Sequence, residues 1–389
     1  MRIAELRRAL GWGQERLLTE LEQHAFRLGR SAPTRNSLRT SLSRWENGHN
    51  VPDESSRELL CAALGCSEDE LGVGESSAPV GGSEPQPTVS STAAITPDTL
   101  HIYRNLLGMY AQLDASAGPR AAIGPVREQL RTLEGLLHQA SAPMRSELAE
   151  LAARYAELGG WLAQDNGDSA AAASWSAKAA DLAALTGNAN LVSYVWMRRS
   201  NVATDAGQAH EGLLLADGAL AQADRLPADL QALAYRQHAH AYALRGDELQ
   251  TGRAIDRALD ITVHSTDASD LAPYCGVSYI QSEAASAWVR LGRPDRAVGL
   301  LDDALRNWPA EQARDHGIGL ARLAHAVLLA GELDRACGLG HQAADAVQAI
   351  PSARALDELE QLRGTLHQYR RNQPTVAELS DRLRLILRA

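Results

Sequence analysis

The sequence predicts an all-α protein made of two helical parts. Its 389 residues include a single Phe among many Ala and Leu, which favours close packing of helices over a β-sandwich. Glycine-containing turns recur at nearly constant intervals in the C-terminal part, and this regularity predicts repeated helix pairs. Residues 73–97 are rich in Gly, Ser, Pro and Thr and show no apolar periodicity. We therefore predict an N-terminal domain at 1–72, a flexible linker at 73–97 and a helical repeat domain at 98–389.

The charge of the chain is unevenly distributed. Residues 1–60 contain ten Arg and eight Asp or Glu, which gives this segment a net charge of +2. Because the whole chain has a net charge of −10, the remaining residues carry −12. A mildly basic N-terminal domain is compatible with contacts to phosphates, whereas an acidic body does not itself bind nucleic acid. A prediction of DNA binding therefore depends on a motif and not on charge.

The four cysteines, Cys61, Cys66, Cys275 and Cys337, have no metal-ligand spacing with histidines and are too few for a disulfide framework. We expect reduced, structural thiols and no metal or cofactor. No apolar run approaches the roughly 18 residues of a membrane helix. The first residues lead directly into a predicted helix rather than a signal peptide, so we expect a cytoplasmic protein.

The N-terminal domain begins with two short helices. Ile3, Leu6 and Leu10 have the spacing of an amphipathic helix, and Gly11-Trp12-Gly13 interrupts it. Gln14 then opens a second helix. After the third helix, Pro52 and the capping residues that follow it predict a fourth helix to Leu64, and Ser67–Leu71 predicts a short fifth one.

The third helix, within Ser37–Pro52, has two distinct faces. Leu38, Leu42 and Trp45 lie on one face at helical spacing, and Glu46 is expected to pair locally. Asn47-Gly48 predicts the end of this helix. The polar side chains on the opposite face can reach a DNA groove: Arg39, Thr40, Ser43 and Arg44.

Together these motifs resemble the Xre-type, lambda-repressor-like helix-turn-helix family. The resemblance covers about seventy residues and implies a five-helix DNA-binding domain. It also implies that DNA is contacted by Gln14, Arg39, Thr40, Ser43, Arg44 and Asn47. The connection from Leu28 to Asn36 is longer than usual in the family, and its arginines either add phosphate contacts or belong to a solvated loop. The helix-turn-helix could alternatively serve only protein contacts.

The C-terminal part is organised by its turns. Gly167, Gly207, Gly246, Gly292 and Gly331 each separate two amphipathic segments, at spacings of 40, 39, 46 and 39 residues. The stretch from 146 to 352 resembles a tetratricopeptide-repeat array, which implies a right-handed α-solenoid. Two helices at 100–140, broken at Gly118-Pro119 and Gly124-Pro125, and two more at 353–389 are expected to cap its ends. Either cap can supply a dimer surface.

The repeat register predicts which side chains face the concave groove of the solenoid. These positions are more polar and aromatic than packed helices require, which suggests an extended peptide or a small anionic molecule as ligand, although such residues can also merely solvate a concave surface. The predicted ligand-binding residues are Trp161, Gln164, Tyr194, Met197, Arg198, Asn201, Arg236, His240, Tyr279, Glu283 and Arg322, and the same register adds Glu157, Ser282, Ser286 and His325.

Other polar clusters have simpler interpretations. His238 and His240 are two residues apart and point in different directions, so we predict no metal site. Asp165, Asp168 and the Asp302-Asp303 pair are expected to be solvated helix ends rather than acid–base groups. Gly338 and Gly340 are expected to permit close packing inside a helix. No constellation supports an enzyme.

The combination of domains resembles peptide-responsive quorum-sensing regulators of Gram-positive bacteria, and more closely the helix-turn-helix and repeat regulators of actinobacteria. It implies a homodimeric, sequence-specific transcription regulator whose solenoid binds a peptide or small-molecule signal that alters DNA binding. The alternative is a DNA-bound scaffold whose solenoid holds a protein partner without small-ligand control.

Overall fold

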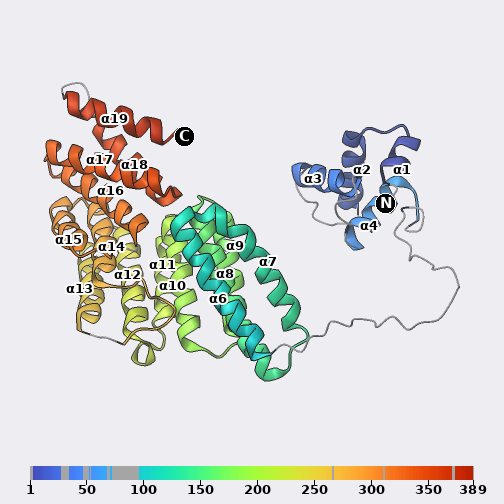
Figure 1. Cartoon of the computed structure of the whole chain (residues 1–389), viewed down its shortest axis with the longest axis horizontal. Coiled ribbons are helices and arrows are strands. Elements are labelled where there is room, and N and C mark those ends of the chain that lie inside the picture. The colour runs from blue at the N-terminus through green and yellow to red at the C-terminus, as the bar shows by residue number, and fades with distance from the viewer. Residues whose placement is uncertain are drawn as a thin grey trace. The chain divides into compact units, whose positions relative to one another are not determined.

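The computed structural model describes residues 3–27, 35–46, 52, 54–67, 71, 96–264, 267–309, 312–369 and 373–388, in which every regular element is a helix. The chain separates into two units, Met1–Val89 and Ser90–Ala389, and each is considered by itself (Figure 1). The all-α prediction is confirmed for the described residues. Among them, no helix combines the length and apolar character needed to cross a membrane.

The first unit contains four described helices: α1 (Ile3–Ala9), α2 (Gln14–Arg27), α3 (Arg35–Glu46) and α4 (Glu54–Leu64). Leu17, Leu18 and Leu60 are fully buried between them, and Trp45 is 9% exposed in the same core, as predicted. The connection at 28–34, most of the predicted fifth helix and the predicted linker from 73 to 95 lie outside the described residues.

The second unit is an array of paired helices. Its members are α6 (Pro97–Ala117), α7 (Pro119–Leu137), α8 (Ala142–Asp165), α9 (Ser169–Ala184), α10 (Ala189–Asp205), α11 (Ala209–Ala219), α12 (Ala228–Leu244), α13 (Glu248–His264), α14 (Val277–Arg290), α15 (Pro294–Arg306), α16 (Ala313–Leu329), α17 (Leu333–Ala349), α18 (Ala353–Leu366) and α19 (Pro374–Ile386), with a short 3₁₀ turn at Ala223–Arg225. Short turns join the two helices of each pair, which therefore pack as antiparallel neighbours.

The five predicted turns are confirmed at the boundaries α8–α9, α10–α11, α12–α13, α14–α15 and α16–α17. At each one the glycine has a positive φ, for example +76° at Gly207. This left-handed conformation ends the first helix of a pair and is costly for any residue with a side chain. The glycine spacing in the sequence therefore reports the length of each repeat.

One predicted break in the N-terminal cap is wrong. The chain does turn at Gly118-Pro119, but α7 continues through Pro125 to Leu137. Proline inside a helix removes one backbone hydrogen bond and costs about 3 kcal/mol. Val126 and Leu133, both fully buried against the neighbouring helix, offset that cost and keep the helix continuous.

Close packing at the C-terminal end uses one of the two predicted glycines. A Cβ atom added at Gly340 in α17 would lie 2.5 Å from Leu379 Cδ2 in α19, so only glycine fits there without rearrangement. A Cβ atom at Gly338 would meet nothing within 4 Å. The packing prediction is therefore confirmed for Gly340 alone.

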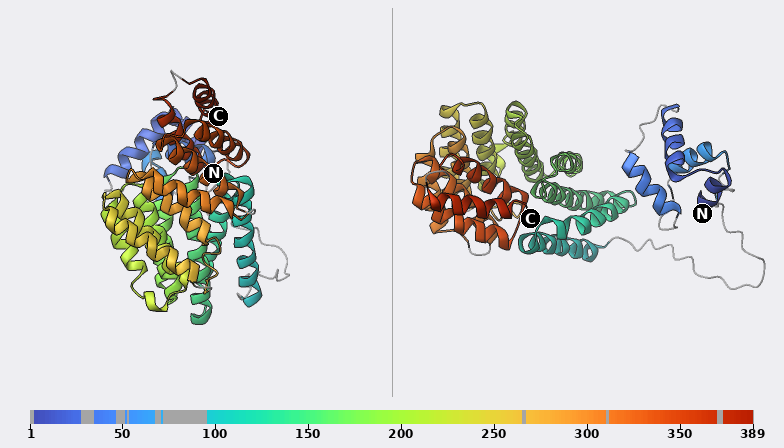
Figure 2. Two further views of the ribbon diagram at one scale, coloured as in Figure 1. Left: turned by 90° about the vertical axis from the view of Figure 1, so that its left-hand side faces the viewer. Right: turned by 90° about the horizontal axis from the view of Figure 1, so that it is seen from above.

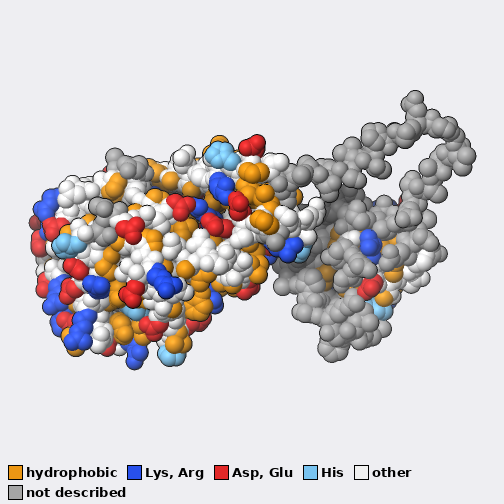
Figure 3. Space-filling view, turned by 90° about the horizontal axis from the view of Figure 1, so that it is seen from below, with side chains coloured by type: hydrophobic (Ala, Val, Ile, Leu, Met, Phe, Trp, Pro, Cys, Tyr) orange, Lys and Arg blue, Asp and Glu red, His pale blue; other side chains and the backbone are white. Residues whose placement is uncertain are grey.

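The solenoid turns back on itself, so that its last helices lie beside its first ones (Figure 2). A Cβ atom added at Gly118, between α6 and α7, would lie 3.3 Å from the carbonyl oxygen of Pro351, just before α18. This closure brings together residues about 200 positions apart in the sequence and forms the wall of the site described next. On the face of the solenoid drawn in Figure 3, acidic and basic side chains are interspersed with apolar ones.

Candidate functional site

The interior of the solenoid contains a cavity of about 620 Å³. Its wall is formed by α6, α8, α10, the segment between α13 and α14, and the first turns of α14 and α16. Ligand sites in proteins usually have volumes of about 300–1,000 Å³. The cavity is therefore large enough for a small organic molecule.

One side of the cavity is apolar. This part of the wall is formed by Leu107, Gly108 and Ala111 in α6 together with Leu158 in α8 and Leu191 in α10. The segment between α13 and α14 adds two further apolar side chains, those of Leu271 and Pro273. An apolar group of a ligand that binds here leaves water and contacts hydrocarbon side chains, and this removal of apolar surface from water favours binding.

Three tyrosines form another part of the wall. The hydroxyl of Tyr194 lies 3.4 Å from that of Tyr274 and 3.5 Å from Glu157 Oε1. The rings of Tyr274 and Tyr279 meet edge to face with centroids 5.1 Å apart. Burial raises the pKa of all three phenols, so they remain neutral hydrogen-bonding groups at physiological pH.

The charged groups of the wall are already paired with one another or with neighbours. Arg198 Nε donates to Glu157 Oε1 at 2.8 Å, and Arg154 Nη1 donates to Asp270 Oδ2 at 2.7 Å. Arg198 also donates to Asn201 at 2.6 Å and to Gln164 at 3.0 Å. Burial acts to lower the pKa of Arg198, but the Glu157 carboxylate and the neighbouring tyrosines together outweigh it, and the pKa is raised. Arg198 therefore stays charged and committed to its protein partners.

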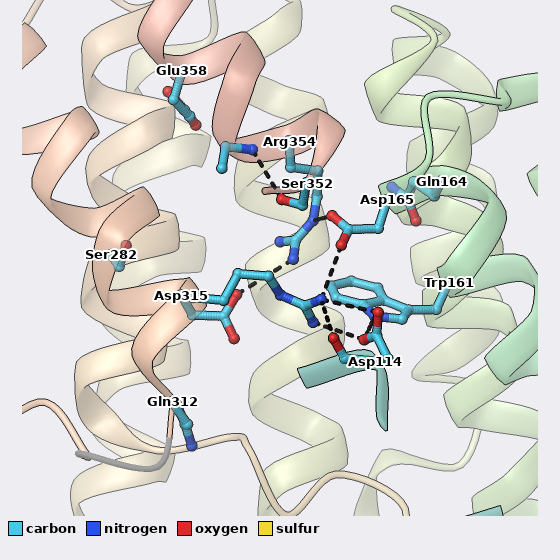
Figure 4. Close-up of polar contacts among 12 residues, drawn as sticks. Asp114, Trp161, Gln164, Asp165, Ser282, Gln312, Asp315, Ser352, Arg354 and Glu358 are labelled. Carbon is cyan, nitrogen blue, oxygen red and sulfur yellow. Dashed lines mark hydrogen bonds and ion pairs between the residues drawn. The ribbon is translucent and has the colours of Figure 1, made fainter. Parts of the chain in front are cut away.

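A group that we call the closure cluster joins the two ends of the solenoid: Asp114, Asp165, Arg314 and Arg354 (Figure 4). Arg314 Nη2 of α16 donates to Asp114 Oδ2 of α6 at 2.8 Å, and Arg354 Nε of α18 donates to Asp165 Oδ1 of α8 at 2.8 Å. Arg314 Nη1 also lies 3.2 Å from Asp165 Oδ2.

The closure cluster is packed against the ring of Trp161, whose Nε1 donates to Asp114 Oδ2 at 3.2 Å (Figure 4). The guanidinium carbon of Arg354 lies 4.1 Å from the ring centroid, which is a cation–π distance. The expectation that Asp165 is solvated is wrong, because its side chain is fully buried between two arginines. Asp168 instead caps α9, and Asp302 and Asp303 form exposed pairs with Arg335 and Arg306.

A second group, the central cluster, lies deeper among the inner helices and does not line the cavity. Glu283 of α14 accepts from Arg236 at 2.8 Å and from Arg322 at 2.7 Å, and Arg322 also donates to Glu358 at 2.7 Å. Burial opposes the charge on Glu283, but the two arginines outweigh it and hold its pKa well below the usual range. Burial and the nearby arginines lower the pKa of His240, 3.5 Å from Glu283, to about 4.

The structure thus divides the predicted groove residues into two sets. Those that line the cavity are Trp161, Tyr194, Arg198 and Tyr279, together with Glu157. The others lie in the adjoining hydrogen-bonded network or the central cluster: Gln164, Met197, Asn201, Arg236, His240, Glu283 and Arg322. All of them occur on the inner helices α8, α10, α12, α14 and α16, as the repeat register predicts.

Sequence reasoning missed the contributions of α6, of the 267–276 segment and of Arg314 with Asp315. The helix α6 was expected only to cap the array, yet five of its residues line the cavity. The spacing of the turn glycines indicates that this repeat contains an additional segment. Gly246 and Gly292 are 46 residues apart, whereas the other turn glycines are 39 or 40 residues apart. The additional residues form the segment that carries Tyr274 into the cavity wall.

The outer face of α3 is the second candidate site. Arg39 is exposed and forms an ion pair with Glu15 of α2. Arg35 Nη2 also lies 3.3 Å from Glu15 Oε2. These arginines lower the pKa of Glu15 through their hydrogen bonds. Ser43 is half-buried, while the side chains of Thr40 and Arg44, and all of Asn47, lie outside the described residues.

Glu46, the last residue of α3, forms hydrogen bonds with side chains that are distant from it in the sequence. Glu46 accepts from Arg7 Nε of α1 at 2.7 Å and from Gln14 Nε2 of α2 at 2.7 Å. The expectation of a local partner for Glu46 is therefore wrong, because Arg7 is 39 positions away. The Gln14 amide, predicted to contact DNA, is oriented by Glu46 at the start of α2.

The described residues contain no group of three or more His, Cys, Asp or Glu side chains placed to hold a metal ion. Within the same ranges, the four cysteines form no disulfide with one another.

No protein-family model and no curated protein matches the chain. Among solved structures, it is similar to Rap protein complexed with Competence and Sporulation Factor at 10% identity, covering 74% of this chain and 98% of that one, with a TM-score of 0.47. For apo NprR, a quorum sensor from B. thuringiensis, the identity is 13%, the coverage 74% and 85%, and the TM-score 0.42. For BtubC from P. vanneervenii they are 16%, 60% and 92%, and 0.43.

Proposed function

We propose that the chain is a homodimeric, sequence-specific DNA-binding transcription regulator whose solenoid binds a peptide or small-molecule signal. The observation that carries the DNA-binding part is the two-faced character of α3. Leu38, Leu42 and Trp45 anchor one face in the core, while Arg39 on the opposite face has 52% of its side chain exposed. A helix held in this way can enter a major groove and present its outer side chains to base edges.

Arg39 is also available for exchange. Its partner Glu15 has 60% of its side chain exposed, and ion pairs between exposed groups contribute little to stability. A phosphate or a guanine edge can therefore replace the Glu15 carboxylate at small cost. In a homodimer, two copies of α3 placed 34–36 Å apart would read successive major grooves, as in other helix-turn-helix dimers.

The solenoid provides a means of control. Its cavity is lined by α6 and α8 near one end of the array and by α16 near the other, so a ligand inside contacts both ends. Separation of the ends would take the cavity apart, and a ligand must therefore bind the closed form more tightly than an open one. Such a difference in affinity is the requirement for a ligand to act as a switch.

The test is a selection of bound sequences from a random duplex pool with the full-length protein, its Arg39→Ala/Ser43→Ala variant and an Arg306→Ala control. Arg306 is also exposed and paired with a carboxylate, but it lies on α15. We expect wild type and control to enrich the same two-fold-symmetric site and the double variant to enrich none, with helix content and dimer mass unchanged. Enrichment by the double variant would refute the assignment of α3.

The same purified protein separates a ligand-controlled regulator from a DNA-bound scaffold. Ligand control requires that a compound bound in the cavity changes DNA affinity without a further protein. If compounds occupy the cavity and DNA affinity stays constant, the scaffold is the better description.

A further inference from the structure

The chemistry of the cavity wall narrows the class of signal. The wall contains four arginines and four carboxylates: Arg104, Arg154, Arg198, Arg314, Asp114, Glu157, Asp270 and Asp315. Each of them has a partner of opposite charge within 3.4 Å, either across the wall or just behind it. A charged group on a ligand would therefore have to displace one of these partners to gain a counter-ion, which is strongly unfavourable at the buried pairs of Arg198 with Glu157 and of Arg314 with Asp114.

The tyrosines, in contrast, retain hydrogen-bonding capacity. Ordinary bonds between two hydroxyl or carboxylate oxygens measure about 2.5–3.0 Å. The contacts of the Tyr194 hydroxyl with Tyr274 and Glu157 are 3.4 and 3.5 Å, so they are weak. A ligand oxygen placed between the two phenols can form a shorter bond with either of them without breaking a strong one.

We propose that the cavity binds an uncharged, mainly apolar small molecule that carries a hydroxyl or carbonyl group. Its hydrocarbon part lies against Leu107, Leu158 and Leu191, and its oxygen meets the hydroxyls of Tyr194 and Tyr274. This inference rests on the proposed role of the solenoid as the signal-binding part of the regulator. It excludes the anionic ligand that the arginine-rich groove suggests from the sequence, because those arginines are already neutralised.

Gly108 allows the cavity to be filled without disturbing the fold. It lies in the wall on α6, and a Cβ atom added there would meet nothing within 4 Å. The Cβ atom of Gly108→Phe is therefore accommodated at the cavity wall, and the substitution replaces a poor helix former with a better one. Gly135→Phe is the matched control, since Gly135 lies inside α7, also has no atom within 4 Å of an added Cβ, and does not line the cavity.

The probe is N-phenyl-1-naphthylamine, a neutral apolar dye whose fluorescence rises in apolar surroundings, titrated into the full-length protein. We expect saturable binding to wild type and to Gly135→Phe, and affinity at least tenfold lower for Gly108→Phe. Absence of saturable binding, or equal binding by all three proteins, would overturn the proposal. Circular dichroism establishes that each variant is folded.

Competition with one ring system in three charge states tests the selectivity. 1-Naphthol, 1-naphthoate and 1-naphthylmethylammonium share a naphthalene ring, and we expect the neutral alcohol to displace the dye at least tenfold more effectively than either ion. Equal or better displacement by an ion would contradict the proposal.

Tyr194→Phe should weaken the binding of 1-naphthol about three- to tenfold and leave the binding of naphthalene unchanged, because it removes one hydroxyl and no apolar surface. An equal loss for both compounds would exclude the hydroxyl contact.

The outcomes of these ligand-binding experiments do not depend on whether the chain binds DNA. If the dye and 1-naphthol bind as expected but no duplex is enriched, the cavity assignment stands and the regulator assignment falls. If a duplex is enriched but the cavity takes no neutral compound, the chain remains a DNA-binding protein and its signal belongs to another class.

Discussion

The outer face of α3 and the wall of the solenoid cavity use arginine in opposite ways. Arg39 on α3 is exposed and pairs with an exposed carboxylate of a neighbouring helix. Arg198 and Arg314 in the cavity wall have only 6% and 7% of their side chains exposed and are enclosed by carboxylates and amides. The exposed pair can open to accept a phosphate, whereas breaking a buried pair leaves an uncompensated charge. Arginine therefore remains exchangeable in the first region and acts as a structural support in the second.

The largest effect expected from this contrast is at Glu283 in the central cluster. Glu283→Gln keeps the shape of the side chain but leaves Arg236 and Arg322 buried without their shared carboxylate. Loss of one partner of a buried pair typically costs about 3–5 kcal/mol. We expect the free energy of unfolding of the solenoid in urea to fall by about that amount. Glu248→Gln, which breaks the exposed pair with Arg293, should change little, and an equal loss in both variants would contradict the contrast.

A pH effect of similar size is expected from His240. Its pKa is about 4 in the folded protein, compared with about 6.5 in an unfolded chain, so the unfolded state binds the proton more readily between these values. Stability should therefore decrease as pH falls from 6.5 to 4, by an amount on the order of 3 kcal/mol from this group. His240→Gln should flatten the unfolding free energy over this range. An unchanged slope in the variant would assign the pH dependence to other groups.

An intermediate effect is expected in the closure cluster. Asp165→Asn weakens contacts to Arg314 and Arg354, but each arginine retains a second carboxylate, Asp114 or Asp315. We therefore expect a loss of about 1.5–3 kcal/mol, the usual contribution of a hydrogen bond to a charged group. Hydrogen exchange should accelerate at the start of α18, where the last helices meet the first. Acceleration spread evenly over the whole solenoid would indicate that Asp165 supports the fold generally and not its closure.

The smallest change in stability is expected on α3. Glu15→Gln removes the exposed carboxylate that pairs with Arg35 and Arg39, and the thermal midpoint should remain unchanged. The affinity for the selected duplex should instead rise about two- to fivefold, because the phosphates no longer compete with Glu15. A clear fall in the thermal midpoint would show that the pair stabilises the domain.

The helices and turns were predictable because their determinants are local. A glycine such as Gly207 ends a helix through its own backbone conformation, and its recurrence gives the repeat length directly. The inner faces of the helices followed from the same register. The limits of this reasoning are visible at Pro125, where packing of α7 overrides a local helix breaker.

The closure of the solenoid and the state of its arginines depend on contacts that no local pattern encodes. Arg314 meets Asp114 200 positions away, and their distance is set by the accumulated curvature of the whole array. For the same reason, a polar residue on an inner helix cannot be classified from the sequence as free for a ligand or neutralised by a partner. Arg198 and Arg236 were predicted as ligand contacts on their position alone, whereas their carboxylate partners lie 41 and 47 residues away.

The most direct test of the account is the affinity of the full-length protein for the selected duplex, measured by fluorescence anisotropy over a series of salt concentrations. Arg39→Ala should weaken binding at least tenfold. If Arg39 contacts a phosphate, the slope of the logarithm of the binding constant against the logarithm of salt concentration should also become smaller by about one. Arg306→Ala, on the solenoid, should match wild type. Equal losses for the two variants, or none for Arg39→Ala, would contradict the assignment of α3 as the DNA-reading surface.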